Sequence, residues 1–315
     1  MLNLLRARSK SPYLLVFGIH RNVVHFVVVD VRDTSQPQLI VSDEHVVTQD
    51  DAAASMRALL DKYSRYGKHD PRLALVLGSG LYQSVTLDKP QLSDAELASS
   101  LRYQLTDLVS FEPDDCLADY YELPLQVQGQ QKIHAIAASR SQLAPLLKVA
   151  HELTERVQGI YAEEQALEKL HSENTEAGAL VYQQNQQPAL VQVYSNAELQ
   201  VTRAVRSLEK ISELTLDEIK LGGLQPLSIE IQRSADYFER QLRQRPLAVV
   251  WLAIGIEKNQ EVLSTVHEDL GLDVVWASYP TWAQELAAGD YSDFPVLGGA
   301  LLALADSSNE PEVSS

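Results

Sequence analysis

Apolar residues near the start of the chain come in three short runs separated by polar turns. The runs cover residues 13–17, 23–31 and 38–47, and β-branched side chains, which suit the pleated surface of a strand, dominate the second. A helix-compatible segment follows at residues 51–63, and a further apolar run occupies residues 72–77. The pattern predicts three consecutive strands, a helix and a fourth strand.

The same order of elements returns in the second half of the chain. Short strand-like runs at residues 179–182, 189–194 and 198–205 again come before any helix. They are followed by predicted helices at 208–221 and 227–243, a strand at 247–254, a helix at 258–270 and a strand at 273–276. Such an internal repeat predicts an α/β protein with two similar domains, each with a β-β-β-α-β core. We place the domains at residues 13–171 and 177–305.

The first domain carries additional elements, which predict an inserted α/β subdomain at about residues 81–155. After a strand at 81–87, Ser93 and Glu96 have the spacing of a capping box. In this motif each side chain accepts a hydrogen bond from the backbone N–H of the other residue. Apolar residues at helical spacing then predict one buried helix face: Leu97, Leu101, Leu105 and Leu108. Two strands (116–123 and 132–138) and a helix (141–155) complete the subdomain.

Three further segments complete the predicted organisation. A strand at 157–161 and a helix at 163–171 end the first domain, and a terminal helix contains Gly298 and Gly299. Glycine lowers helix propensity, so we expect close packing of this helix against a neighbour or a ligand. Residues 1–12 form a basic N-terminal arm, and residues 306–315 are expected to be a disordered acidic tail.

Charge, cysteine content and hydropathy limit the partners and the compartment that can be expected for this protein. The formal net charge is -17, which disfavours nucleic acid because a phosphate backbone would be repelled. Cys116 is the only cysteine, so an intramolecular disulfide is impossible and a reducing compartment is favoured. No apolar run approaches the roughly 20 residues that a membrane-spanning helix requires.

The residue types that usually carry catalysis or metal binding form no recognisable motif here. The eight histidines are scattered, and we expect them in loops or on the surface, with no metal site. Glu163 and Glu164, like Asp114 and Asp115, are adjacent carboxylates that point in different directions within a helix or strand, so we expect no catalytic dyad. Glycine-rich loops of the Walker and dinucleotide-binding types are absent.

Four motifs, taken together, resemble the PilM-like type IV pilus assembly proteins. Residues 229–238, Ile-Glu-Ile-Gln-Arg-Ser-Ala-Asp-Tyr-Phe, are the most specific of them and resemble the family's "E-I-x-R-S-x-D-Y" helix. The stretches at 111–120, 135–140 and 297–301 resemble its "I-P-F…D-Y" segment, its "A-A-x-R/K" strand end and its closing "A-L-G-x-A-L" helix. The resemblance extends over most of the chain, and it is strongest with the members of the family that serve MSHA pili.

The resemblance implies an actin-like (ribonuclease H-like) ATPase fold. It also implies a cytoplasmic protein, peripheral to the inner membrane, that binds the cytoplasmic tail of a bitopic pilus platform protein of the PilN or MshJ type. A homo-oligomer or ring is also consistent with the family, and no membrane-spanning segment is expected. Aromatic side chains often anchor such peptides, so Tyr82, Tyr103 and Tyr120 are candidate partner contacts, with half-buried packing as the alternative for each.

The two loops that hold phosphate in the family differ in this chain. Gly18 and Tyr182 stand where an acidic residue is expected, and Pro188 cannot donate an N–H. We therefore expect a structural adaptor with a degenerate nucleotide cleft and no cofactor. At most, His20, Arg21 and Asn22 would form a residual anion site. The alternative is an active ATPase that uses ATP and Mg²⁺, and a sugar kinase of the same fold is a third class.

Overall fold

The computed structural model describes residues 11–171, 175–184 and 186–309. Its first five-stranded sheet has the order β3-β2-β1-β4-β8, in which β1, β2 and β3 are antiparallel and β4 and β8 run parallel to β1. The strands are β1 (Tyr13–Ile19), β2 (Val23–Asp30), β3 (Gln38–Val46), β4 (Arg72–Leu77) and β8 (Val157–Ala162). The predicted meander of three strands is confirmed and is antiparallel. The two strands that follow it in the sheet, β4 and β8, are parallel to β1.

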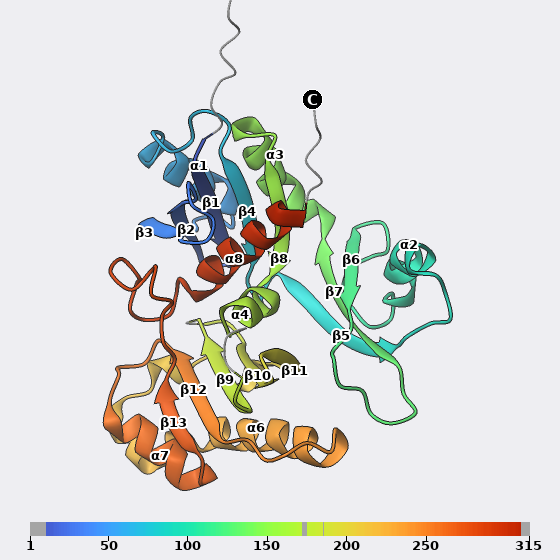
Figure 1. Ribbon diagram of the computed structural model, residues 1–315, viewed down its shortest axis with the longest axis vertical. Helices are drawn as coiled ribbons and strands as arrows, with labels where there is room; N and C mark the ends of the chain where they lie inside the picture. The colour runs from blue at the N-terminus through green and yellow to red at the C-terminus, as the bar shows by residue number, and fades with distance from the viewer. Residues whose placement is uncertain (1–10, 172–174, 185, 310–315) are drawn as a thin grey trace, which may run out of the picture.

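The second five-stranded sheet repeats this topology. Its order is β11-β10-β9-β12-β13, again an antiparallel meander followed by two parallel strands. The strands are β9 (Gly178–Gln183), β10 (Ala189–Ser195), β11 (Glu198–Val205), β12 (Val249–Ile254) and β13 (Asp273–Trp276). We call the parts of the molecule built on these two sheets the first and second lobes; Figure 1 shows them at the top and bottom of the view.

Helices cover both faces of the first sheet. On one face α1 (Ala52–Lys62) and α3 (Arg140–Leu153) share an apolar core with the strands. On the other face lie α4 (Glu163–His171) and α8 (Phe294–Asn309). A methyl group on Gly298 of α8 would lie 1.9 Å from the carbonyl oxygen of Ala166 in α4, so glycine permits this helix contact. The helix α8 thus comes from the end of the chain but packs on the first sheet.

The second sheet packs against α6 (Gln225–Asp236) and α7 (Gln260–Leu270) on one face. Its other face contacts Leu167 of α4 and Phe294 of α8. The single helix predicted at residues 208–221 is wrong. Short turns replace it: η1 (Arg206–Leu208), η2 (Ile211–Glu213), α5 (Leu216–Glu218) and η3 (Ile219–Gly223). Leu214 and Thr215 have ψ values of 131° and 159°, which interrupt a right-handed helix inside this range.

A third sheet, beside the two lobes, lies in the predicted inserted subdomain (Figure 1). Its order is β5-β7-β6, with antiparallel pairing, and α2 (Asp94–Gln104) packs on one face. The strands are β5 (Tyr82–Asp88), β6 (Cys116–Tyr121) and β7 (Lys132–Ser139). The capping box of Ser93 and Glu96 is confirmed. Leu108 is 51% exposed, contrary to the prediction, because α2 ends at Gln104 and no longer directs it inward.

The chain ends differ in part from the expectation. Helix α8 continues to Asn309, so residues 306–309 of the predicted disordered tail are helical, and the Asp306 carboxylate accepts a hydrogen bond from the Tyr161 hydroxyl at 2.7 Å. Residues 310–315 and residues 1–10 of the predicted arm lie outside the described part of the chain. Within that part, no helix is both long enough and apolar enough to cross a membrane.

Candidate functional site

Loops from the two lobes meet beside the start of α4. The side-chain Nε of Arg21, in the β1–β2 turn, donates to the carbonyl oxygen of Gly80 at 3.0 Å. The hydroxyl of Ser79, which follows β4, donates to the carbonyl oxygen of Pro188 in the β9–β10 loop at 3.3 Å. The β1–β2, β4–β5 and β9–β10 loops are therefore in direct contact, and we call the space around them the interlobe cleft.

His20 fills the centre of this cleft. Its side chain is buried, and its Nε2 lies 3.8 Å from Oε1 of Glu163 at the start of α4. A methyl group on Gly78 would lie 2.2 Å from His20 Nδ1, so the ring packs directly against the backbone after β4. Burial, with a smaller contribution from His25, lowers the pKa of His20 to about 3. The ring is therefore neutral at physiological pH.

Glu163 is the buried acid of the same cluster. Its Oε2 accepts a hydrogen bond from the backbone N–H of Ser79 at 2.9 Å. Its Oε1, like His20 Nδ1, has no hydrogen-bond partner among the described residues. Burial raises the pKa of Glu163 to about 7, against the opposing effect of the Ser79 N–H and of the nearby Ser79 and Tyr182 hydroxyls. A carboxyl group that titrates near neutrality therefore lies between the two lobes.

The expectation that the histidines lie in loops or on the surface is wrong for three of them, because His25, His134 and His171 are buried within strands or a helix. His20 lies in the β1–β2 turn and is also buried. His25 and His134 lie within strands, where the β pairing fixes their direction, and His20 follows β1 directly. Among the described residues, no group of three or more His, Cys, Asp or Glu side chains is arranged to hold a metal ion.

The three residues of the predicted residual anion site do not point together. His20 is directed into the protein, whereas Arg21 and Asn22 are exposed. Because the Arg21 guanidinium already donates to Gly80, any anion at this turn would have to share that group. The anion site stays a prediction, and of its three residues only Arg21 and Asn22 are exposed to a ligand.

Glu164, the next residue of α4, belongs to a second buried cluster. Its Oε1 accepts a hydrogen bond from the Tyr121 hydroxyl at 2.8 Å and lies 3.1 Å from Nε2 of His134. Its Oε2 is 3.5 Å from the Tyr82 hydroxyl. These three partners lie on β6, β7 and β5, so one carboxyl group connects the whole inserted sheet to α4. Adjacency of the two glutamates was visible in the sequence, but their burial was not.

The three candidate partner tyrosines lie in different environments. Tyr82 is buried and faces α4, so it contributes to packing in this structure. Tyr120 packs on the opposite face of the inserted sheet, where its hydroxyl donates to Asp94 at 3.1 Å. Tyr103 of α2 is 56% exposed. The structure does not bring them together as one surface, and partner binding by any of them stays a prediction.

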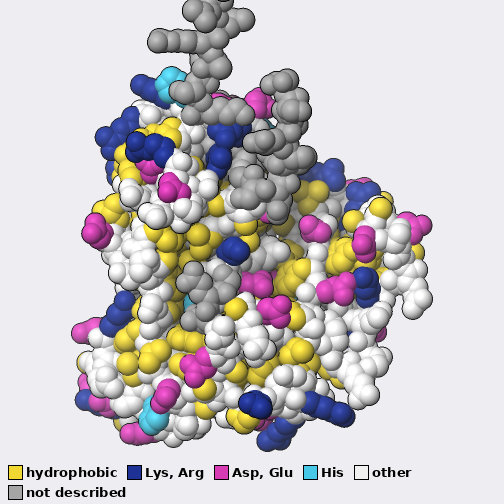
Figure 2. Space-filling model, in the orientation of Figure 1, with side chains coloured by type: hydrophobic (Ala, Val, Ile, Leu, Met, Phe, Trp, Pro, Cys, Tyr) yellow, Lys and Arg dark blue, Asp and Glu magenta, His cyan; other side chains and the backbone are white. Residues whose placement is uncertain are grey.

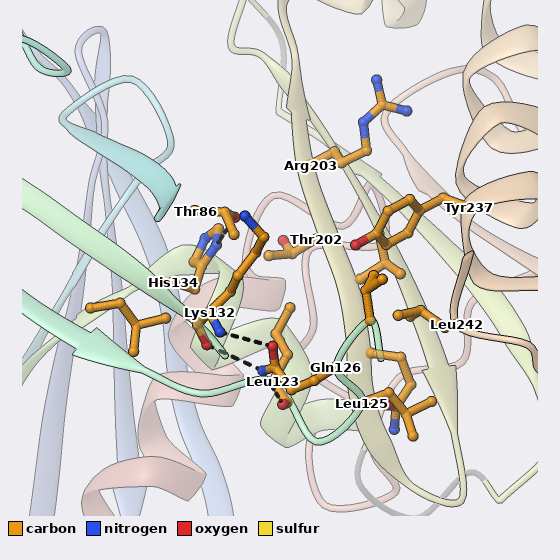
Figure 3. A pocket seen from close by; sticks show the side chains of 14 residues that line it. Thr86, Leu123, Leu125, Gln126, Lys132, His134, Thr202, Arg203, Tyr237 and Leu242 are labelled. Carbon is orange, nitrogen blue, oxygen red and sulfur yellow. Dashed lines mark hydrogen bonds between the residues drawn. The ribbon is translucent and has the colours of Figure 1, made fainter. Parts of the chain in front are cut away.

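A cavity of about 270 Å³ lies where the inserted subdomain meets the second lobe. Figure 3 shows its wall: Thr86 and His134 come from the inserted sheet, Thr202 and Arg203 from β11, and Tyr237 from the end of α6. Residues 122–131, which connect β6 to β7 and which we call the strap, close one side of the cavity. Sequence reasoning missed this site because its residues come from distant segments.

Charged side chains of both signs are mixed on one face of the molecule. On the face shown in Figure 2, Lys and Arg side chains are interspersed with Asp and Glu among the coloured residues and form no continuous basic area. This distribution agrees with the net charge of -17.

Comparison with known proteins defines the class of fold. No family model matches the chain, and no curated protein matches it. Among solved structures, the PilM–PilN type IV pilus biogenesis complex is similar with a TM-score of 0.61 and 14% identity, covering 95% of this chain and 99% of that one. The protein therefore has the actin-like ATPase fold.

Two further structures support this assignment. The cytoplasmic domain of EpsL, an inner-membrane component of the type II secretion system of Vibrio cholerae, has a TM-score of 0.52 and 13% identity, over 96% of this chain and 98% of that one. A Bacteroides thetaiotaomicron protein of unknown function with an actin-like ATPase fold has a TM-score of 0.52 and 11% identity, over 94% and 98%. The predicted fold class is confirmed.

Proposed function

We propose that this protein is a structural adaptor of a type IV pilus biogenesis machine. The observation that carries the proposal is the similarity to a PilM–PilN complex, which extends over 95% of the chain. The adaptor would bind the cytoplasmic tail of a bitopic inner-membrane partner of the PilN or MshJ type, and would be cytoplasmic and peripheral to that membrane. The sequence motifs favour the MSHA system, in which the corresponding protein is MshI.

The interlobe cleft supports a structural role over nucleotide hydrolysis. An actin-like site needs an acidic residue in each phosphate loop to position metal and water. A methyl group on Gly18 would lie 2.6 Å from Val296 Cγ1, so the first loop has no room for an acidic side chain. In the second loop, Tyr182 is fully buried and its hydroxyl faces Gln184.

The second loop is also closed by its own hydrogen bonds. The Gln183 amide donates to the carbonyl oxygens of Gln187 and Glu209 at 3.1 and 2.9 Å. Pro188 has no N–H to offer a phosphate. A methyl group on Gly80 would lie 2.4 Å from Gln187 Oε1, which shows how closely this loop approaches the first lobe. The backbone N–H groups of Gln186 and Gln187 donate to the carbonyl oxygens of Glu209 and Gln184 at 3.2 and 2.9 Å, so they are not free to surround a phosphate.

Nucleotide binding can be tested by calorimetry with ATP and Mg²⁺, paired with a phosphate-release assay. We expect no turnover and binding that is weak or absent. Micromolar affinity, or turnover that an Arg21→Ala change abolishes, would favour the alternative of an ATPase with ATP and Mg²⁺ as its cofactors. Loss of a single preorganised transition-state donor lowers catalysis by about 10²–10³-fold, so several missing groups should abolish it.

Partner binding needs a separate test. The purified protein should co-purify with the full-length platform protein, and a peptide of that protein's cytoplasmic tail should raise its melting temperature. In cells without the platform protein, fractionation should find the adaptor in the cytosol. Persistent membrane association there, or no interaction with the tail, would contradict the adaptor role.

A further inference from the structure

The strap, residues 122–131, crosses from the inserted sheet to the second lobe. Leu125 and Val127 pack against the core of the second lobe, and Leu123 packs against the cluster that contains Tyr182. The residues at 122, 124 and 128 are exposed. Inward aliphatic side chains therefore occur at every second position, as they do in a strand that packs one face on a core.

Side chains, not strand pairing, hold the strap in place. The Gln126 amide donates to the carbonyl oxygens of Leu123 and Lys132 at 3.0 and 3.2 Å, and its Oε1 accepts from the Lys132 N–H at 3.0 Å. No main-chain hydrogen bond joins the described residues of the strap to β11. Pro124, near the start of the strap, lacks an N–H and weakens any such pairing.

At this place the second lobe offers a strand edge that has no main-chain partner among the described residues. β11 is the terminal strand of its sheet, and residues 200–203 line the cavity. Gln200 is only 3% exposed, yet its Oε1 has no hydrogen-bond partner within the described part of the chain. An unpartnered acceptor of this kind is costly unless a donor meets it. The cavity thus combines apolar contacts, an open strand edge and an acceptor that a peptide N–H would satisfy.

We propose that the outer edge of β11 and the adjoining cavity form a docking groove for an extended segment of a partner protein. That segment would carry aliphatic side chains at alternate positions, pair its main chain with β11 and take the place of the strap. Strand addition to an exposed sheet edge is an established mode of peptide recognition, in which pockets for alternate side chains provide specificity. The strap is then an internal placeholder, which occupies the groove until a partner segment replaces it. The inference does not depend on which pilus partner binds elsewhere on the protein.

The placeholder can be tested with a peptide that copies it. A labelled peptide with the sequence of residues 121–128 is titrated into the wild-type protein and into a Leu125→Ser/Val127→Ser variant with a weakened strap. A tethered segment competes at an effective concentration of about millimolar, so we expect at least tenfold tighter binding to the variant. A second peptide with threonine in place of proline should bind better than the first, since it can donate one more main-chain hydrogen bond.

Two variants locate the binding. Tyr237→Ser, on the cavity wall, should weaken binding of the peptide at least fivefold, while Tyr103→Ser, which removes an exposed tyrosine of α2, should leave it unchanged. If the strap variant does not fold, hydrogen exchange of the wild-type protein with excess peptide gives the same answer, because the amides of β11 should become protected. No binding of either peptide, binding insensitive to Tyr237, or unchanged exchange in β11 would overturn the proposal.

Discussion

Glu163 and Glu164 are neighbours in α4, and both are buried, but they have opposite surroundings. Glu164 has two tyrosine hydroxyls and a histidine ring within 3.5 Å. Glu163 has one backbone donor and an oxygen without a hydrogen-bond partner among the described residues. The well-satisfied carboxyl group joins the inserted sheet to α4, and the poorly satisfied one lies where the two lobes meet. Burial alone therefore does not reveal what a carboxyl group contributes to the stability of the fold. The hydrogen-bond donors around it do.

Glu164→Ala tests the first half of this comparison and should have the largest effect. It leaves the Tyr121 hydroxyl and His134 buried without their shared partner. We expect the free energy of unfolding to fall by about 3 to 5 kcal/mol, as when one member of a buried pair is removed. Urea denaturation measures this loss. Glu168→Ala, a half-buried glutamate one turn further along α4, is the control and should lose clearly less.

Glu163→Gln should change the pH dependence of stability. The folded pKa of about 7 lies above the unfolded value of 4.5, so the native protein holds this proton more tightly. Its contribution is fully present below pH 4.5 and is lost as the pH rises through 7, by about 3 kcal/mol in all. The variant lacks this loss, so its stability relative to wild type should improve steadily between pH 5 and 8.

The quantity to measure is the difference in unfolding free energy between the wild-type protein and the Glu163→Gln variant. The buried histidines change stability with pH in the opposite direction, and this effect cancels in the difference. The pKa of His20 is lowered to about 3 and those of His25 and His171 to about 4. Their stabilising contributions are present above pH 6.5 and are lost as the pH falls, in both proteins. A wild-type-minus-variant difference that is constant from pH 5 to 8 would show that Glu163 does not titrate there.

Gly78→Ala probes the packing around His20 and should cost about 1 to 3 kcal/mol, the usual range for overpacking. The added methyl group would lie 2.2 Å from the His20 ring, so the ring must move. In a His20→Ala background the same change should cost much less. Equal costs in the two backgrounds, measured by thermal or urea denaturation, would mean that the ring does not restrict this position.

A pair of phenylalanine substitutions should give the smallest effects and separates the contacts of Glu164. Tyr121→Phe removes the 2.8 Å hydrogen bond and should cost about 1 to 2 kcal/mol. Tyr82→Phe removes only a 3.5 Å contact, so its cost should be near zero. Equal losses of stability would show that the two hydroxyls serve the carboxyl group equally.

Local pattern was enough to predict both strand meanders and an α/β protein with two similar domains, whereas the family resemblance implied the actin-like fold. Alternation and β-branched content define strands over a few residues, and helix α4 was predicted with its observed bounds because its periodicity lies within one segment. The predicted helix at 208–221 failed for a local reason as well, since the pattern of apolar residues did not register that Leu214 and Thr215 are extended and that Thr215 caps a new turn.

The sequence alone therefore determined most of the order of the elements and the repeat. Only the tertiary structure decided which residues meet. His20 follows β1 and Glu163 begins α4, the strap reaches a lobe to which its own strands do not belong, and α8 returns to the first sheet. The physical reason is that burial and pKa depend on neighbours distant in the chain, whereas strand and helix formation depend mainly on residues close by.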